Sequence, residues 1–362
     1  MKNIYDFLFS LLEEKRQVAL ASIVAAEGST PQVVGASAVF SKEGLLAGTV
    51  GGGLQEAFCQ KKAAKSLDEK KSILFEFKLE ANSPEEDEAL CGGRTKIVIE
   101  PDCEKNIDAF RSLHLSFSKR QPGLLATLIE ICDIDQVSLT RYWIREDEIE
   151  NSNFREPFSL FKEEIKRAFL ESKPGLFLFE KKKQRGEEKE KYIFLEPIYP
   201  IPQLVIAGAG HVGQAVAHLG NFLNFEVTII DDRPELANKI RIPDADHFVI
   251  EDIGEAIKNF PISKDTYLVI VTRGHRQDGQ ALRQCLDSKA AYIGMIGSKR
   301  KIELMRQQFL IEGWATKKQW DRIYAPIGID IGSNTVEEIA VSIAAQLVHV
   351  RSQIREKRKE KK

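Results

Sequence analysis

The sequence predicts an α/β protein with two parts, an N-terminal α+β domain followed by a doubly wound domain built on a parallel sheet. Up to about residue 200, apolar strands are joined by short turns, which is typical of hairpins. Beyond that point, short apolar strands alternate with helical segments, and such βαβ units have parallel strands. The 362 residues also exceed what one hydrophobic core usually organises. We therefore expect domains at 1–200 and 201–350 and a basic tail, the frayed end of a helix, at 351–362.

The first half begins with an amphipathic helix, because apolar residues recur at helical spacing from Ile4 to Arg16. Strands are expected at 18–26, 35–40, 45–50, 73–79, 95–100 and 124–131, and a second helix at 54–71. The charged run 180–191 lies between apolar strands at 175–179 and 192–195. We interpret this run as the solvated tip of a hairpin rather than as a domain linker.

The boundary between the halves is placed at Glu196–Pro202, where three prolines disfavour helix and interrupt strand pairing. The second half is then expected to contain strands at 204–207, 226–231, 246–250, 267–272 and 290–293, and helices from His211, at 277–287, at 298–312 and at 336–354.

Composition narrows the class of protein. The formal net charge of −2 gives no electrostatic argument for nucleic acid or for an anionic membrane. No signal peptide is apparent, and no stretch has the length of a charge-free membrane span. The 5 cysteines are scattered, without a C-x-x-C pair, which favours reduced thiols over disulfides or zinc. We expect a cytoplasmic protein whose partners are small molecules or proteins.

A glycine motif lies at the first strand-to-helix turn of the second half. Gly208 permits the tight turn, Gly210 lets the backbone approach a pyrophosphate, and Gly213 lets helix and strand pack closely. Asp231 ends the next strand, where its carboxylate would hold a ribose diol, although adjacent Arg233 weakens the preference for NAD over NADP. The motif therefore predicts a Rossmann-type domain that binds NAD or another adenine nucleotide. A Rossmann-shaped domain without its ligand is the alternative.

Other polar residues of the second half fall at neighbouring turns. His211, inside the glycine motif, either touches phosphate or is capped by backbone at the helix start. His275 and Asp278 follow a strand at the carboxyl edge and are either a base with its orienting partner or ordinary loop residues.

A further turn combines Gly297 with Ser298, a natural N-cap, and with Lys299 at the head of a basic run. Cations in a first helical turn oppose the helix dipole, so they are either kept for an anion or form a solvated face.

The first half has its own glycine turn, in which Gly51, Gly52 and Gly53 lead into a helix that carries Glu56. Successive glycines before a helix allow several amides to converge on an oxyanion, or they form only a flexible turn.

Downstream of that helix, Cys91 is followed by Gly92 and Gly93, which give its sulfur little steric cover. Such a thiol is either accessible to a ligand in a cleft or, like most single cysteines, buried filler. Cys59, within the preceding helix, is expected to serve packing.

Together these motifs resemble the xanthine dehydrogenase accessory proteins, the XdhC/CoxI family. The resemblance covers almost the whole chain, and the order and spacing of the motifs make it specific. It rests on Gly28–Pro31, Gly48–Gly53 with Glu56, Cys91–Gly93, Gly208–Gly213, Ala291–Ser298, and Ala325–Gly332 before Thr335–Ala340.

The resemblance implies an XdhC/CoxI domain followed by a Rossmann domain, and a role in maturing molybdenum hydroxylases. Such proteins bind molybdenum cofactor, protect it while a cysteine desulfurase installs sulfur, and deliver it to a xanthine dehydrogenase-like client. Self-association as a homodimer stays open. The implied cofactor site contains Ser29, Thr30, Gly51, Gly52, Gly53, Glu56, Cys91, Gly92 and Gly93. No residue is expected to bind metal directly, except that Cys91 is a candidate contact to molybdenum.

Two departures from the family pattern bear on that contact. Leu54 follows the triple glycine where relatives often carry a polar or sulfur residue, and Leu90 stands where many have a second cysteine. Cys91 would therefore act alone. A cofactor-maturation chaperone is favoured over an enzyme with its own turnover. An NAD-dependent oxidoreductase that uses His275 and a non-catalytic nucleotide-sensing partner protein are the competing hypotheses.

Overall fold

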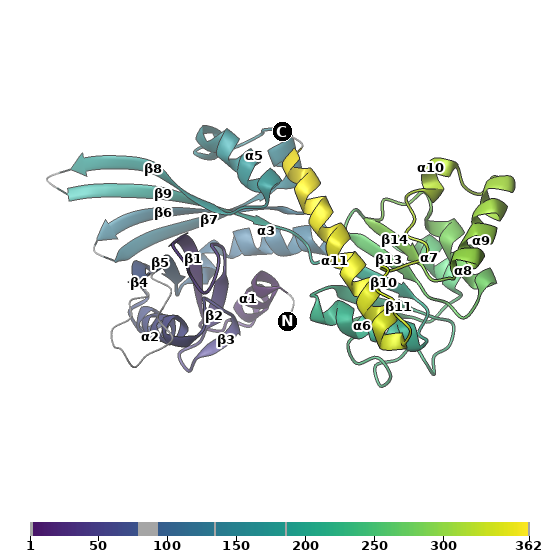
Figure 1. The fold of residues 1–362 in the computed structure, drawn as a ribbon. Coiled ribbons are helices and arrows are strands. Elements are labelled where there is room, and N and C mark those ends of the chain that lie inside the picture. Colours follow the sequence, from purple (N-terminus) through teal and green to yellow (C-terminus); the bar gives the residue numbers. More distant parts are fainter. Residues whose placement is uncertain (1–2, 79–92, 134, 185–186, 361–362) are drawn as a thin grey trace. The chain divides into compact units, whose positions relative to one another are not determined.

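The computed structural model describes residues 3–78, 93–133, 135–184 and 187–360. By its internal contacts the chain divides into an N-terminal unit, Asn3–Pro200, and a C-terminal unit that begins at Ile201. Each unit is built around one sheet (Figure 1).

The N-terminal unit contains a 9-stranded sheet in the order β3-β2-β1-β5-β4-β7-β6-β9-β8. Every neighbouring pair in it is antiparallel. The strands are β1 (Ala19–Glu27), β2 (Ser37–Phe40), β3 (Leu45–Gly48), β4 (Ile73–Lys78), β5 (Arg94–Glu100), β6 (Gly123–Asp133), β7 (Gln136–Arg145), β8 (Gly175–Gln184) and β9 (Glu187–Ile198). The helices are α1 (Ile4–Glu13), α2 (Gly53–Glu69), α3 (Ile107–Ser118), α4 (Glu146–Glu150) and α5 (Lys162–Glu171), with 3₁₀ turns η1 (Cys103–Asn106) and η2 (Phe158–Phe161).

Helices cover both faces of this sheet because side chains alternate along its strands. In β1, Leu20 is buried in one cluster with Phe110 of α3, whereas Ala19 and Ala21 are buried in another with Cys59 of α2. The continuous apolar run in β1 is therefore the signature of a strand buried on both sides.

A network of buried charges crosses the interior of the N-terminal unit. Arg141 donates from Nε to Glu100 at 2.6 Å, and both side chains are almost fully buried. Nearby, the Tyr5 hydroxyl donates to Glu196 at 2.6 Å. Burial raises the pKa of Glu196 to about 7, although the Tyr5 hydrogen bond and the Arg141 charge oppose the rise. This carboxyl is therefore easily protonated in the folded protein.

The charged run near residue 185 is confirmed as a hairpin, since β8 and β9 remain paired as far as Gln184 and Glu187. The expectation that prolines after Glu196 interrupt pairing is wrong for the first of them, because Pro197 pairs with Leu124 of β6. On its other side, β9 pairs with β8, and this pairing begins at Leu195. Pro197 lies beyond the start of that pairing, so its missing N–H group costs no hydrogen bond to β8.

The C-terminal unit is confirmed as a doubly wound Rossmann-type fold. Its 5-stranded sheet has the order β12-β11-β10-β13-β14, with every neighbouring pair parallel. The strands are β10 (Gln203–Ala207), β11 (Glu226–Ile230), β12 (His247–Val249), β13 (Thr266–Ile270) and β14 (Tyr292–Met295). The helices are α6 (His211–Phe222), α7 (Ile253–Asn259), α8 (His275–Cys285), α9 (Lys299–Ile311), α10 (Lys317–Trp320) and α11 (Val336–Glu360).

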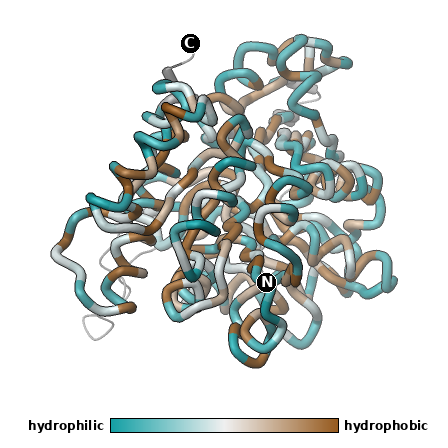
Figure 2. The backbone as a smooth tube through the Cα atoms, turned by 90° about the vertical axis from the view of Figure 1, so that its right-hand side faces the viewer, coloured by the Kyte–Doolittle hydropathy of each residue, from teal (hydrophilic) through white to brown (hydrophobic). Residues whose placement is uncertain are grey.

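The last helix, α11, runs without a break across the expected start of the tail at residue 351. Hydrophobic and hydrophilic residues alternate along it (Figure 2). Arg351 is held in the fold rather than frayed, because it donates to the carbonyl of Leu223 at 3.0 Å and lies over the ring of Phe225. Across the described residues, no helix combines the length and the apolar character that a membrane crossing requires.

Candidate functional site

The carboxyl edge of the parallel sheet is the first candidate site. Strand β10 pairs with β11 on one side and with β13 on the other, so the strand order reverses at β10. Ligands of doubly wound sheets bind at such a reversal, beyond the carboxyl ends of the strands. The glycine loop Gly208–Gly213 lies there, between β10 and α6.

The three motif glycines have separable roles. Gly208 has φ +120°, and a Cβ there would lie 2.4 Å from the carbonyl oxygen of Val271. A Cβ on Gly213 would lie 1.9 Å from the carbonyl oxygen of Gly208. By contrast, a Cβ on Gly210 would meet nothing within 4 Å, and its backbone is extended. Protein packing therefore explains Gly208 and Gly213, whereas the space in front of Gly210 is open.

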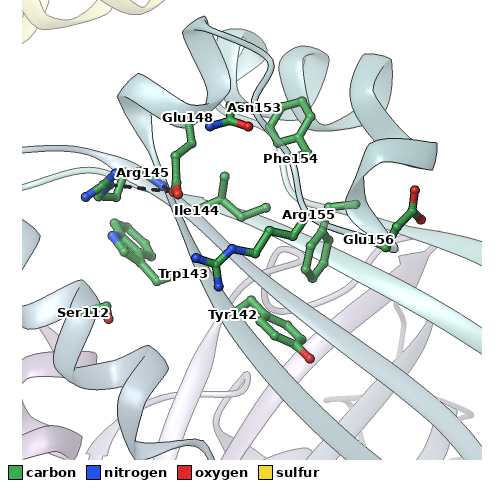
Figure 3. Close-up of a pocket in the computed structure, with 11 residues that line it drawn as sticks. Ser112, Tyr142, Trp143, Ile144, Arg145, Glu148, Asn153, Phe154, Arg155 and Glu156 are labelled. Atoms are coloured by element: carbon green, nitrogen blue, oxygen red, sulfur yellow. Dashed lines mark hydrogen bonds and ion pairs between the residues drawn. The ribbon is translucent and has the colours of Figure 1, made fainter.

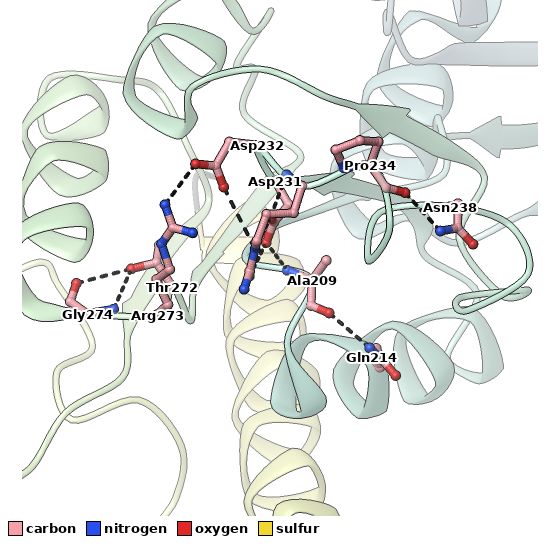
Figure 4. Close-up of polar contacts among 10 residues, drawn as sticks. Ala209, Gln214, Asp231, Asp232, Pro234, Asn238, Thr272, Arg273 and Gly274 are labelled. Atoms are coloured by element: carbon pink, nitrogen blue, oxygen red, sulfur yellow. Dashed lines mark hydrogen bonds and ion pairs between the residues drawn. The ribbon is translucent and has the colours of Figure 1, made fainter.

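Asp231 does not present a free carboxylate to a ribose. Its Oδ2 accepts from the Ala209 amide at 2.7 Å and from Arg233 Nη2 at 2.9 Å. Its Oδ1 accepts from Arg233 Nε at 2.8 Å and from the Arg233 amide at 3.0 Å (Figure 4). A carboxylate has about four acceptor positions, and these donors fill them. The expected ribose acceptor is thus closed by Arg233.

These bonds also set the charge of Asp231, which is 1% exposed. Burial opposes its ionisation, but the hydrogen bonds from Arg233 and Ala209 outweigh burial and lower its pKa. Next to this pair, Arg273 donates to Asp232 at 3.0 Å (Figure 4). Two arginines and two aspartates therefore lie together at this edge.

The expected pairing of His275 with Asp278 is not formed. Asp278 is fully buried and accepts from the Thr272 hydroxyl at 2.6 Å and from Lys301 Nζ at 2.8 Å. His275 is exposed at the first turn of α8. The carboxylate thus fixes the loop after β13 and binds a lysine of α9 instead of orienting a base.

The basic turn before α9 is formed as predicted at its cap, because the Ser298 hydroxyl accepts from the Lys301 amide at 3.3 Å. Gly297 lies against Ile302, and a Cβ there would be 2.9 Å from that side chain. Lys299 is exposed. His211, the first residue of α6, is also exposed, at the Gly210 end of that helix.

The second candidate site lies at the edge of the N-terminal sheet that is formed by the ends of its strands. There the glycine turn after β3 leads into α2. Gly51, Gly52 and Gly53 all have positive φ, which non-glycine residues rarely adopt. Glu56 reaches back from the first turn of α2 and accepts from the Thr49 hydroxyl at 2.7 Å and from the Val50 amide at 3.3 Å. Glu56 is therefore an internal brace of the turn, at the helix end where a negative charge is favourable.

Three motif loops converge at this edge. The glycine turn touches the first loop, since a Cβ on Gly51 would lie 2.9 Å from Pro31. Gly93 touches the same loop, since a Cβ there would lie 2.2 Å from the carbonyl oxygen of Ser29 and 2.8 Å from Thr30. Strand pairing agrees, because Glu27 at the end of β1 faces Arg94 at the start of β5.

The thiol predicted for this edge cannot be placed, because Cys91 and Gly92 lie outside the described residues, as does Leu90. Leu54 is 60% exposed on the first turn of α2. Cys59 is fully buried, and burial raises its pKa to about 12. It has the packing role expected of it. Among the described residues there is no cluster of three or more acidic, histidine or cysteine side chains suited to a metal ion.

One polar residue of this edge was not predicted. Gln55 is 1% exposed and donates from Nε2 to the Val50 carbonyl at 2.5 Å, yet its Oε1 has no hydrogen-bond partner. An unpaired buried amide oxygen is costly. Its position directly after the triple glycine and Leu54 is the only signal that the sequence offers.

Comparison with known proteins now identifies the family. Residues 11–78 match the model of the XdhC and CoxI family, and residues 204–347 match that of the XdhC Rossmann domain. The chain belongs to the XdhC family. The glycine turn after β3 and the glycine loop after β10 both lie within the matched residues.

Full-length similarity extends to a probable xanthine dehydrogenase subunit from Bacillus subtilis strain 168, with 24% identity over 98% of this chain and 99% of the relative. The uncharacterized protein YqeB of Escherichia coli K12 is 32% identical over 42% of this chain, a match that spans 28% of the length of YqeB. A crystal structure described as a xanthine dehydrogenase from Bacillus halodurans has the same fold, with a TM-score of 0.70, 21% identity and 96% coverage of each chain.

Proposed function

We propose that this protein is a cofactor-maturation accessory protein. It binds molybdenum cofactor, supports sulfuration of the cofactor by a cysteine desulfurase, and assists its insertion into a xanthine dehydrogenase-like molybdenum hydroxylase. Membership of the XdhC family supports the general role. The convergence of three motif loops at one edge of the N-terminal sheet is the observation that carries the site.

The residues at this edge fit a phosphorylated, metal-bearing pterin. A Cβ on Gly52 or Gly53 would meet nothing within 4 Å, so the start of α2 faces open space. Backbone amides at a helix start attract anions, such as the phosphate of the cofactor. Ser29 adds a hydroxyl group from the neighbouring loop, and the Thr30 hydroxyl, which donates to the Gln32 carbonyl at 2.8 Å, can still accept a hydrogen bond. A ligand can lie against the backbone only where no side chain fills the space, as at Gly52 and Gly53.

In this proposal the chain binds and shields the cofactor, and it catalyses no reaction itself. The cofactor supplies the molybdenum centre, and Cys91 supplies the thiol that contacts it. Glu56 keeps the glycine turn in shape by holding Thr49 and Val50. The amides of Gly52 and Gly53 orient the anionic end.

The experiment is to purify the protein without oxygen after co-expression with a client hydroxylase, and to release the bound ligand. We expect molybdenum and a phosphorylated pterin in the absorbance and mass spectra. Light scattering of the same sample reports whether the protein is a homodimer. A preparation that activates the client yet releases neither molybdenum nor pterin contradicts the proposal.

A second candidate function, binding of NAD or another adenine nucleotide, is favoured by the open space at Gly210. Calorimetric titration with NAD, NADP, FAD and ATP tests it, with Gly210→Val as the variant that should lose binding. Absence of heat from all of them with the parent protein contradicts it. Of the competing hypotheses, a nucleotide-sensing role needs only this site. An oxidoreductase also needs a catalytic group. Its candidate base, His275, is not oriented by Asp278, because that carboxylate accepts from Thr272 and Lys301.

A further inference from the structure

A cavity of about 340 Å³ lies in the N-terminal unit, away from the three motif loops. We call it the Trp143 pocket, after a residue of β7 in its wall (Figure 3). Its size falls in the range of small-molecule sites. Its lining includes Tyr142, Trp143, Arg145, Glu148, Arg155 and Phe158.

The pocket opens on a free segment of strand edge. Within the part of the chain that the structure describes, β4 pairs with β7 only at Ile73 and Gln136, so the later part of β7 has a strand neighbour, β6, on one side alone. Side chains cap the other side. Asn106 accepts from the Arg141 amide at 2.9 Å, and Glu148 accepts from the Arg145 amide at 2.9 Å.

Trp143 lies between these two capped positions. Because alternate residues of a strand point their N–H and C=O groups to the same side, the main chain of Trp143 faces this edge as well. This strand edge therefore offers one N–H donor and one C=O acceptor, both from the main chain of Trp143. Added strands pair over several residues, so the capped positions on either side leave no room for a peptide strand.

The aromatic walls of the pocket are held in place by other elements. The Trp143 indole donates to the Ser116 hydroxyl at 2.8 Å and packs edge-on against Phe117, both of α3. Tyr142 packs edge-on against Phe158 of η2, with ring centroids 4.9 Å apart, and remains 42% exposed. Fixed aromatic surfaces of this kind lose little entropy when a planar ligand stacks on them.

The pocket lining includes an exposed cation, Arg155. In the view of Figure 3 its guanidinium lies between the rings of Trp143 and Tyr142. The other charged groups of the wall are engaged within the protein. Arg145 lies 3.2 Å from Asp147, Glu148 caps the Arg145 amide, and Glu156 accepts from the Ser159 hydroxyl.

We propose that the Trp143 pocket binds a phosphorylated nitrogen heterocycle, either a purine mononucleotide or a pterin phosphate. Both sources share the chemistry that the pocket complements. Each has a planar ring that can stack on Tyr142 or on Trp143, whose side chains leave β7 on opposite faces. Each also has an adjacent donor and acceptor for the main chain of Trp143 and a phosphate for Arg155. The site is separate from both glycine-bearing edges and does not depend on the function proposed for them.

The test uses the full-length protein and calorimetric titration with AMP, GMP and neopterin monophosphate. We expect at least one of them to bind with a Kd below about 1 mM, and the tightest of them identifies the source of the ligand. Adenosine, guanosine and neopterin, which lack the phosphate, should each bind about tenfold more weakly than their phosphates, because they lose a charge-assisted hydrogen bond. Purine riboside monophosphate, which lacks an exocyclic group, should also bind more weakly than AMP.

Variants locate the binding. Arg155→Ala should weaken binding about tenfold or more, and Tyr142→Leu should weaken it too. Arg111→Ala is the matched control, because Arg111 is an exposed arginine of α3 that pairs with Asp108 outside the pocket. Every titration is made in the Gly210→Val background, so that the nucleotide binding proposed for the glycine loop of the C-terminal unit does not contribute heat. Failure of all three phosphates to bind in that background, or unchanged affinity when Arg155→Ala is added to it, overturns the proposal.

Discussion

The two glycine-bearing edges use similar sequence motifs in different ways. In the C-terminal unit, Gly208 and Gly213 are required by backbone contacts, and only Gly210 faces open space. In the N-terminal unit, Gly51 touches Pro31, whereas Gly52 and Gly53 face open space. Contacts within the protein therefore account for Gly208, Gly213 and Gly51, and only the glycines that face open space are candidates for contact with a ligand.

The two units also differ in how the fold shifts the pKa of a buried carboxyl group. Hydrogen bonds from Arg233 and Ala209 overcome burial and lower the pKa of Asp231. Burial dominates at Glu196 and raises its pKa to about 7. The cause is the number of donors, because two reach each oxygen of Asp231 whereas the Tyr5 hydroxyl is the donor to Glu196. The two units are therefore expected to respond to pH in opposite directions.

The largest effect should come from Gly213→Ala, which tests whether packing alone requires this glycine. The new Cβ would lie 1.9 Å from a backbone oxygen, which cannot move without disturbing the turn. We expect a loss of about 3 kcal/mol or more from the stability of the C-terminal unit, the upper end of overpacking costs. Urea unfolding measures this. Gly210→Ala is the matched control and should cost less than about 1 kcal/mol, and equal losses in the two variants would contradict the separation of roles.

The pH response comes next in size and tests the contrast between the buried carboxyl groups. Because folding raises the pKa of Glu196 from 4.5 to about 7, its contribution is complete below about pH 4.5 and is lost as the pH rises through 7. Each unit of pKa difference corresponds to about 1.4 kcal/mol, so the loss should be a few kcal/mol at most. Thermal melts from pH 5 to 8 measure the stability of the N-terminal unit.

The matched variant for that experiment is Glu196→Gln, which should make the transition of the N-terminal unit nearly independent of pH over this range. Asp231 behaves oppositely, because its lowered pKa contributes stability that is lost only in acid, as the pH falls below the ordinary value for an aspartate. An unchanged pH slope in Glu196→Gln would show that other groups cause it.

A smaller effect, about 1 kcal/mol, is expected for Glu56→Ala, because the variant removes the acceptor for the Val50 amide and the Thr49 hydroxyl at the start of α2. If the glycine turn holds cofactor, the bound molybdenum should fall as well. Urea unfolding and metal analysis are the two measurements. Glu69→Ala, at the opposite end of the same helix, where Glu69 forms an exposed ion pair with Lys65, should change neither. Equal effects at both ends would exclude a specific brace.

The last effect concerns nucleotide affinity at the C-terminal edge and leaves the stability of the unit aside. Arg233→Ala should free acceptor positions on Asp231 and strengthen NAD binding about tenfold, since a ribose diol can then donate to the carboxylate. Calorimetry compares it with Arg241→Ala, an exposed arginine of the same unit. Weaker NAD binding in Arg233→Ala would mean that this arginine contacts the ligand itself.

Patterns local in sequence predicted the C-terminal sheet well. Four of its five strands are apolar runs, and helices follow β10, β12, β13 and β14, which favours parallel pairing, whereas β12 follows β11 without a helix between them. The short helices α7 and α10 were not predicted, and neither were α3, α4, α5 and β7 in the N-terminal unit. In α3 the apolar residues Phe110, Leu113 and Phe117 do recur at helical spacing, so the sequence carried a signal that was missed.

The sequence could not predict which side chains pair with one another. The motif predicted the position of Asp231, but only the structure shows Arg233 covering it. His275 and Asp278 are neighbours on one helix, yet Lys301, from another helix, supplies the cation that Asp278 binds. The convergence of Gly28–Pro31 with Gly93 likewise depends on the pairing of β1 with β5, which links segments far apart in the chain.

The most direct test of the proposed cofactor site compares Cys91→Ser with Cys59→Ser, both co-expressed with a client hydroxylase and purified without oxygen. Cys59 is fully buried, with its pKa raised to about 12, so its variant reports packing effects alone. Molybdenum content and client activation are measured for each. We predict that Cys91→Ser loses both and that Cys59→Ser retains them per folded molecule. Retention of cofactor and of full client activation by Cys91→Ser would contradict a role for this thiol.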